Sequence, residues 1–347
     1  MAMKQDSSVL DTLRAIAVLL VLVDHICETV APIHPYDWYM GRLGVLLFFV
    51  HTSCVLMMSM QRTPMTGLPL ARHFYIRRAF RIYPLSILTV AVVLMVGVPQ
   101  VAWSPELPDR SVLTVVANLL LVQDLVGAHS VSAPLWSLPL EIQMYVLLPG
   151  IFILINRGAS LSRALGLWIF GVLVAVLVPS FGPRLPLFVP CFLSGIIGFC
   201  LSQRVKPRMP FWIWPIALIG LATLYTVLSS ASDAVHSEYA AWLTCLAAGI
   251  LLPTVRETTS WIRHVSRVIA TYSYGIYLAH MPALWVAFVV LGDWPIAAQW
   301  AMFFVLLAGA SVLAYHALEQ PMVRLGNRIA NRAQPSRTGN RAVVAVR

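Results

Sequence analysis

The chain has few charged residues for its length. Of its 347 residues, 11% are charged and 59% are hydrophobic. Soluble globular domains are about a quarter charged, and here apolar runs recur along nearly the whole chain, so the composition excludes a soluble fold. The alternating apolar and polar residues of a membrane β-barrel are also absent. The sequence therefore predicts an all-α polytopic membrane protein.

Several signatures of soluble enzymes and metal proteins are missing as well. The chain has no G-x-S-x-G elbow, no H-E-x-x-H motif and no glycine-rich nucleotide loop. The cysteines have no metal-ligand spacing and lie in or beside apolar segments, so we interpret them as small apolar residues. They are Cys27, Cys54, Cys191, Cys200 and Cys245. No metal site is predicted. The net charge of +10 would point to nucleic acid in a soluble chain, but in a membrane protein it reflects cytoplasmic arginine, so no nucleic-acid partner is expected.

Ten apolar segments are long enough to cross a bilayer, at about 20 residues each. They lie near residues 12–31, 43–60, 84–102, 136–155, 164–181, 187–203, 211–229, 238–255, 269–291 and 297–318. An eleventh stretch, 111–122, has only about a dozen residues, a length typical of a short re-entrant segment. The first segment lacks a small-residue cleavage site, so we expect it to be retained.

The basic residues predict the orientation. With ten crossings and the N-terminus inside, 21 of the 24 Lys and Arg residues face the cytoplasm, and Arg42, Arg110 and Arg184 lie outside. If 111–122 crossed fully, 8 would lie inside and 16 outside. The positive-inside rule therefore favours ten spans with both termini cytoplasmic. We expect an integral membrane domain over 1–326 and a basic, disordered tail over 327–347.

Two ionisable residues in the first segment are the most informative feature. Arg14 and His25 are eleven residues apart, which is three helical turns plus about 20°, so both lie on one stripe about 16 Å apart along the axis. Such residues usually face a bundle interior or a water-filled cavity. Neutral imidazole can serve there as a general base toward a hydroxyl. Glu28, at i+3, is placed to orient the ring, whereas Asp24 points about 100° away. The alternative is a histidine that is simply satisfied within the core.

Arginine and aromatic residues gather at the inner mouth of the third segment, between His73 and Pro84. Arg78 and Arg81 share a helix face, and their rigid guanidinium groups suit phosphate. This mouth is therefore a candidate site for a phosphate-bearing cytosolic ligand. Ordinary positive-inside anchoring with an aromatic belt is the alternative.

Later segments carry the remaining candidates. Glu141 and Tyr145 are i, i+4 neighbours near the outer end of the fourth segment, where a carboxylate is costly unless it is paired or wetted. Tyr277 and His280 share a face of the ninth segment. They could act in catalysis, or they could form a hydrogen-bonded packing contact. We expect Glu319, at the inner end of the tenth, to be a helix cap or an arginine partner.

In this order the motifs resemble those of the membrane-bound acyltransferase-3 family, which are bacterial O-acyltransferases of surface polysaccharides and related acceptors. The matching pieces are Leu10-Asp11-x-x-Arg14-Ala15 through His25, Gly44-Val45-x-x-Phe48-Phe49, Arg78-x-x-Arg81-Ile82-x-Pro84, Trp136-Ser137-Leu138-x-x-Glu141-x-Gln143-x-Tyr145, Ser273-Tyr274-x-x-Tyr277-Leu278-x-His280-x-Pro282 and Glu319-x-Pro321. The chain departs from the family pattern at Asp24, Leu46, His51-Thr52-Ser53 and Ile142.

The resemblance implies an enzyme of the bacterial cytoplasmic (inner) membrane that takes an acetyl group from cytosolic acetyl-CoA. The acceptor would be a hydroxyl of a surface or exported glycan or glycolipid, such as O-antigen, lipopolysaccharide or exopolysaccharide. Carried over, Arg78 and Arg81 would hold CoA phosphates with Arg14 at the inner end. His25 would deprotonate the acceptor hydroxyl or pass on the acyl group. The remaining predicted catalytic residues are Glu141, Tyr277 and His280, of which Glu141 and His280 would orient the base or the acceptor.

Other readings stay open. The same motifs would fit an enzyme whose acceptor is a small molecule or an oligosaccharide signal. They would also fit transfer of either an acetyl or a longer acyl group. A proton-coupled transporter or glycolipid flippase could use His25, Glu141 and His280 as a relay, although the chain shows no clear internal repeat. The expected partners are membrane lipids, the acyl-CoA donor and the acceptor.

Overall fold

The computed structural model describes residues 7–30, 39–100, 106–155, 160–177, 183–230, 234–258 and 260–332. Most of these residues are helical, and they contain no β-strand beyond an isolated bridge between Met209 and Val255. The helices are α1 (Ser8–Val30), α2 (Tyr39–Arg62), α3 (Gly67–Val96), α4 (Val112–Leu120), α5 (Gln123–Val126), η1 (Ala133–Trp136), α6 (Leu138–Ile155), α7 (Leu161–Leu177), α8 (Leu185–Ser202), α9 (Ile213–Ser230), α10 (Ala234–Leu251), η2 (Leu252–Thr254), α11 (Trp261–Leu284), η3 (Trp285–Val290), α12 (Ile296–Leu313), η4 (Ala314–Glu319) and α13 (Gln320–Arg332).

Each of the ten predicted segments falls on one of these helices. In the described part of the chain, six helical stretches are long and apolar enough to cross a membrane, and α7 and α9 are shorter apolar helices. The predicted all-α fold with several apolar membrane helices is therefore confirmed.

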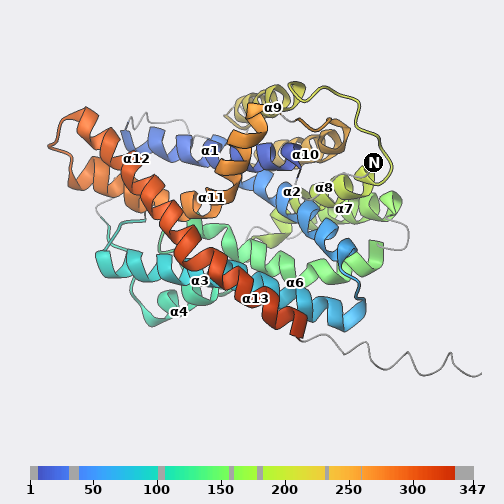
Figure 1. The fold of residues 1–347 in the computed structure, drawn as a ribbon, viewed down its shortest axis with the longest axis horizontal. Coiled ribbons are helices and arrows are strands. Elements are labelled where there is room, and N and C mark those ends of the chain that lie inside the picture. Colours follow the sequence, from blue (N-terminus) through green and yellow to red (C-terminus); the bar gives the residue numbers. More distant parts are fainter. Residues whose placement is uncertain are drawn as a thin grey trace, which may run out of the picture.

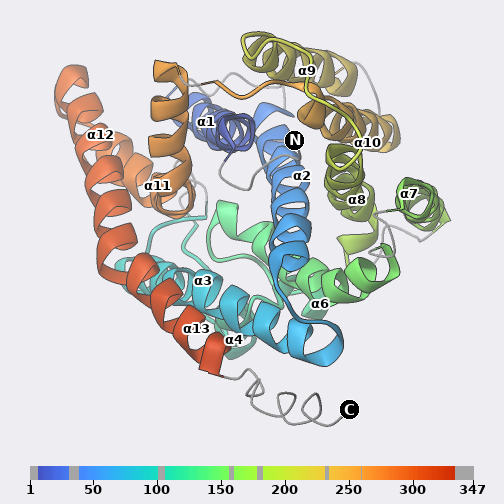
Figure 2. The ribbon, with the colours of Figure 1, turned by 45° about the vertical axis from the view of Figure 1, so that its right-hand side comes forward.

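The helices form one bundle around a buried core (Figures 1 and 2). Helix α1 packs on α2 and α11, α2 packs on α8, and α8 packs on α7 and α10. On the opposite side of α11, helices α12, η4 and α13 form one continuous stretch of 37 residues that runs along the outside of the bundle and crosses α3. At 1.5 Å per residue the path along this stretch is about 55 Å, longer than the roughly 30 Å hydrocarbon core of a bilayer.

The predicted short segment at 111–122 corresponds to α4, a helix of nine residues. Its length of about 14 Å is too short to cross a membrane. Helix α4 runs back beside α3, because Arg110 lies near Gly97 at the end of α3 and the Tyr83 hydroxyl donates to the Leu120 carbonyl oxygen at 3.0 Å. The chain then passes through α5 and η1, and α6 begins inside the bundle, because Leu135 of η1 and Leu138 and Leu140 of α6 are buried.

Residue 327 is too early as the start of the predicted tail, because α13 continues to Arg332. Gly326 and Ala330, one turn apart, are buried, and a Cβ atom at Gly326 would lie 2.5 Å from the Phe80 Cβ atom. His73 adds a contact of 3.2 Å between its Nε2 atom and Asn331 Oδ1. Packing on α3 therefore keeps this basic segment helical. Residues 333–347 lie outside the described part of the chain.

Helices α2 and α8 cross at a glycine. Gly195 lies against the Val50 carbonyl oxygen and the Ser53 hydroxyl so closely that no Cβ atom would fit. Ser53 donates to the Phe192 carbonyl oxygen at 2.6 Å. The backbones of the two helices therefore meet directly, and this contact fixes the position of α2, which supplies residues to the site.

Candidate functional site

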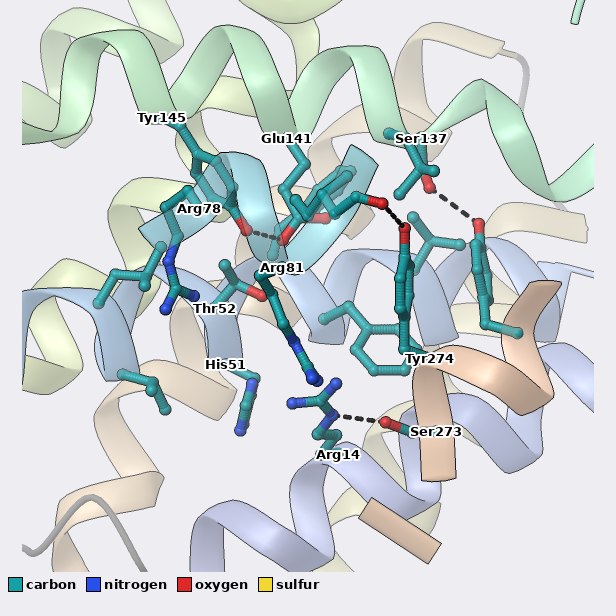
Figure 3. A pocket seen from close by; sticks show the side chains of 18 residues that line it. Arg14, His51, Thr52, Arg78, Arg81, Ser137, Glu141, Tyr145, Ser273 and Tyr274 are labelled. Carbon is teal, nitrogen blue, oxygen red and sulfur yellow. Dashed lines mark hydrogen bonds between the residues drawn. The ribbon is translucent and has the colours of Figure 1, made fainter. Parts of the chain in front are cut away.

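A pocket lies in the middle of the bundle, with about 760 Å³ of empty space, part of it open to solvent (Figure 3). We call it the arginine pocket. Its polar lining comes from α1, α2, α3, α6 with the residue before it, and α11, and consists of Arg14, His51, Thr52, Arg78, Arg81, Ser137, Glu141, Tyr145, Ser273, Tyr274 and Tyr277.

All three arginines that were predicted to bind phosphate line this pocket. Arg14 donates from Nε to the Ser273 hydroxyl at 2.6 Å. Arg81 forms an ion pair with the buried Glu319, which confirms the predicted arginine partner of that carboxylate. Figure 3 shows Arg14 and Arg81 extending toward one another inside the pocket. Three guanidinium groups and one carboxylate line the pocket, so it suits an anionic ligand.

Glu141 lies with the arginines. Tyr145 donates to Glu141 Oε1 at 2.5 Å, one helical turn away, and both residues line the arginine pocket. The sequence predicts Glu141 near the outer end of the fourth segment, where it would orient the base or the acceptor. In the structure Glu141 lines the arginine pocket and does not line the pocket that contains His25.

A second pocket, with about 1010 Å³ of empty space including open solvent, lies where α1 ends and α2, α8 and α10 begin. We call it the histidine pocket. Its lining comprises Val21, Asp24, His25, Gly41, Arg42, Val45, Pro134, Trp136, Arg184, Leu187, Phe188, Glu238 and Tyr277.

Val45 and Tyr277 line both pockets and form a partition between them. The Tyr277 hydroxyl donates to the Pro134 carbonyl oxygen at 2.7 Å and shares a hydrogen bond of 2.8 Å with the Ser137 hydroxyl. The phenol ring also meets Phe48 edge-on, with 6.1 Å between centroids. The η1 turn therefore holds Tyr277 in place.

His25 and His280 face each other, with 5.0 Å between ring centroids. His25 Nδ1 lies 2.9 Å from the Val21 carbonyl oxygen. Because a carbonyl oxygen can only accept, Nδ1 carries the proton and Nε2 is the basic atom. The expected orientation by Glu28 is wrong, since the ring is oriented by its own helix. His280 Nδ1 contacts the Ile276 carbonyl oxygen at 3.2 Å, and its buried Nε2 atom has no hydrogen-bond partner among the described residues.

The predicted stripe on α1 is confirmed. Arg14 contacts Ser273 and His25 contacts His280, and both of these partners lie on α11. The stripe thus faces a single neighbouring helix and connects the two pockets along it.

Sequence reasoning missed several lining residues. His51 is a buried histidine in the arginine pocket, and its position within an apolar segment was the only available signal. Arg42 and Glu238 form an ion pair in the histidine pocket, although the sequence indicated Arg42 only as an outer basic residue. No group of His, Cys, Asp and Glu that could hold a metal ion occurs among the described residues.

The fold and site together define a multi-pass helical membrane protein in which a charged internal pocket adjoins a pocket with a histidine pair. A family model described as an acyltransferase domain matches residues 8–315. The chain therefore belongs to this family, the membrane-bound acyltransferase-3 family that its motifs resemble.

One relative gives a more specific likeness. The chain is similar to the peptidoglycan O-acetyltransferase OatA of Listeria monocytogenes, with 24% identity over 319 residues, which covers 79% of this chain and 49% of the relative. The chain thus spans about half the length of that curated relative. No solved structure matches the chain.

Proposed function

We propose that this protein is a membrane O-acetyltransferase that moves an acetyl group from cytosolic acetyl-CoA to a hydroxyl of a surface or exported glycan or glycolipid. The observation that carries the proposal is the shared partition of Val45 and Tyr277 between an arginine-lined pocket and a pocket with a histidine pair. Membership of an acyltransferase family and the likeness to an O-acetyltransferase support the same reaction class.

The proposed orientation puts the protein in the bacterial cytoplasmic membrane with ten crossings and both termini inside. Arg14 is in the second turn of α1 and His25 is near its other end, so Arg14 lies toward the cytoplasm and His25 toward the outside. The arginine-rich loops support this direction. Donor and acceptor would then reach the partition from opposite sides.

Acetyl-CoA would enter the arginine pocket as a substrate. The guanidinium groups of Arg14, Arg78 and Arg81 would bind its phosphates through charge-assisted hydrogen bonds. Glu319 neutralises part of the charge of Arg81, which leaves Arg14 and Arg78 as the stronger anion ligands. The pantetheine arm is thin and extended, and would carry the thioester toward Tyr277.

His25 would act as the general base. Its Nε2 atom would take the proton of the acceptor hydroxyl while that oxygen attacks the thioester carbonyl carbon. The new C–O ester bond forms as the C–S bond breaks, and the CoA thiolate takes the proton back from the imidazolium. His280 lies against His25 and would position its ring.

The test is acetyl transfer in proteoliposomes that contain labelled acetyl-CoA, with envelope glycan from the source cells as acceptor. His25→Ala should lower the transfer rate by about 10²–10⁴-fold, the usual contribution of a general base, while the affinity for acetyl-CoA stays unchanged. His264→Ala removes an exposed histidine of α11 that lines neither pocket and should leave transfer intact. Undiminished transfer by His25→Ala would remove His25 from the mechanism.

Two pockets on either side of a partition would also suit a proton-coupled transporter or flippase. Such a protein would move its substrate across vesicle membranes without any acyl-CoA. Substrate movement that is independent of acetyl-CoA, with no labelled product, would favour this second function.

A further inference from the structure

The histidine pocket contains two carboxyl groups with an unused oxygen atom. Asp24 is 5% exposed, and its Oδ1 atom has no hydrogen-bond partner among the described residues. Glu238 pairs with Arg42 through Oε1, which leaves the buried Oε2 atom without a partner in the same part of the chain. A buried polar atom left unsatisfied costs about 1–3 kcal/mol. These two oxygens are therefore arranged for a ligand that donates hydrogen bonds.

The position of the Asp24 carboxyl group is fixed by α2. Gly41 packs directly against it, and a Cβ atom at that position would overlap the Asp24 side chain. The Gly41 backbone also forms a hydrogen bond with the carboxylate. Helix α2 thus occupies one side of the carboxyl group, and Oδ1 is the oxygen that remains available.

Aromatic rings form another part of the lining. The Trp136 and Phe188 rings lie 5.5 Å apart between centroids. The guanidinium of Arg184 lies 5.5 Å from the Trp136 centroid and that of Arg42 lies 5.8 Å from the Phe188 centroid. These cation–π contacts hold both rings in place. Flat apolar surfaces beside a few fixed polar atoms are typical of small-molecule sites.

Both arginines of this pocket are paired with carboxylates. Arg42 and Arg184 line it together with Asp24 and Glu238. Arg184 is further paired with Asp124, at 2.8 Å. Because each arginine already has a carboxylate partner, the lining favours a neutral ligand rich in hydroxyl groups over a strongly anionic one.

We propose that the histidine pocket binds a neutral pyranose unit of the acceptor. Its hydroxyl groups donate to Asp24 Oδ1 and Glu238 Oε2, and its C–H face packs on Trp136 and Phe188. A further hydroxyl of the same unit then lies at His25. This last point rests on the proposed function, whereas binding of the sugar does not require acyl-CoA.

Isosteric amide variants give the sharpest test. In Asp24→Asn the amide oxygen keeps the Gly41 contact and turns an N–H₂ group toward the pocket, and Glu238→Gln does the same beside Arg42. Each change replaces an acceptor by a donor without altering shape. Trp136→Leu removes part of the aromatic lining. Asp293→Asn, in an exposed loop away from the pocket, is the matched control.

The measurement is saturation-transfer NMR and calorimetry on the purified full chain, with short oligosaccharides cut from de-O-acetylated envelope glycan of the source cells as the probe. We expect wild type and Asp293→Asn to bind equally. Asp24→Asn, Glu238→Gln and Trp136→Leu should each weaken saccharide binding by about tenfold or more, the effect of one lost hydrogen bond or contact of this kind. Acetyl-CoA binding should change less than about twofold, because the donor occupies the other pocket.

Two results would overturn the inference: no saccharide binding by the wild-type protein, or equal binding by all variants. Saccharide binding with the expected sensitivity but without acetyl transfer would support the pocket assignment and contradict the proposed function. Transfer that proceeds normally in Asp24→Asn and Glu238→Gln would contradict the pocket assignment alone.

Discussion

At the scale of single residues, Glu319 controls part of the charge of the arginine pocket. Its side chain is buried at the end of η4 and pairs with Arg81, one of the pocket-lining arginines. Removing one partner of a buried ion pair leaves an uncompensated charge, which costs about 3–5 kcal/mol. The pair therefore connects the charge of the arginine pocket to the stability of the fold.

Arg81→Met should destabilise the protein by about 3–5 kcal/mol, because Glu319 would stay buried without its partner. The double variant Arg81→Met/Glu319→Gln should recover most of that loss. Thermal unfolding in detergent micelles measures the stability of the single and of the double variant. Arg72→Met, an exposed arginine on the same helix, serves as the control. A double variant as unstable as the single one would contradict this account.

Arg78 has no carboxylate partner within the described part of the chain. Its loss should therefore weaken ligand binding more than it lowers the stability of the fold. Arg78→Ala should raise KM for acetyl-CoA by about tenfold, since a hydrogen bond to a charged group contributes about 1.5–3 kcal/mol. Unfolding temperature and acceptor binding should stay near the wild-type values. Initial rates at varied acetyl-CoA give the result, again with Arg72→Ala as control, and an unchanged KM would exclude Arg78 from donor binding.

The sequence indicates many of the site residues because a titratable side chain in an apolar segment needs a specific environment. His51 carries the same signal, but it lies where the chain departs from the family motif. The pairing of Arg42 with Glu238, and of His25 with His280, depends on how separate helices pack. Spacing along a single segment does not encode such contacts.

At the scale of elements, the apolar runs predict where the helices lie in the sequence. How far inside the bundle each helix begins depends on the turns that connect the helices. The sequence predicts that the fourth segment starts at the outer side, whereas the first residues of α6 and the η1 turn before them are buried in the bundle. A run of apolar residues gives the length of a helix but carries no signal for its depth.

The close crossing of α2 and α8 makes a second element-scale prediction. Gly195→Ala should destabilise the protein by about 1–3 kcal/mol, because the new methyl group would overlap the Val50 carbonyl oxygen and push the helices apart. Gly166→Ala, in α7 with open space around it, should change stability by no more than about 1 kcal/mol.

Thermal unfolding in detergent compares the two variants directly. Because α2 supplies residues to both pockets, Gly195→Ala should also lower the acetyl-transfer rate. Equal stabilities for the two alanine variants would show that the crossing tolerates separation.

At the scale of the whole molecule, the ten crossings predict which loops face each side. In a Cys27→Ser background, in which the remaining cysteines are buried, single cysteines can be placed at exposed positions. Leu107→Cys and Asp293→Cys should react with a membrane-impermeant maleimide in spheroplasts. Ser162→Cys and Arg208→Cys should react only after the membrane is opened.

A permeant maleimide should label all four positions and so serves as the control. Reaction of Ser162→Cys from outside would mean that 111–122 crosses the membrane completely, and would contradict the ten-span orientation. The charge distribution makes this prediction because each further crossing would reverse every later loop.

The partition formed by Val45 and Tyr277 has a consequence for the electrical insulation of the membrane. A bacterium holds a voltage and a proton gradient across its cytoplasmic membrane, and one elementary charge that crosses 100 mV releases about 2.3 kcal/mol. Two water-accessible chambers that joined freely would short-circuit that gradient. In the proposed orientation, the phenol ring of Tyr277, held by the η1 turn, would keep the arginine pocket and the histidine pocket apart and so preserve that insulation.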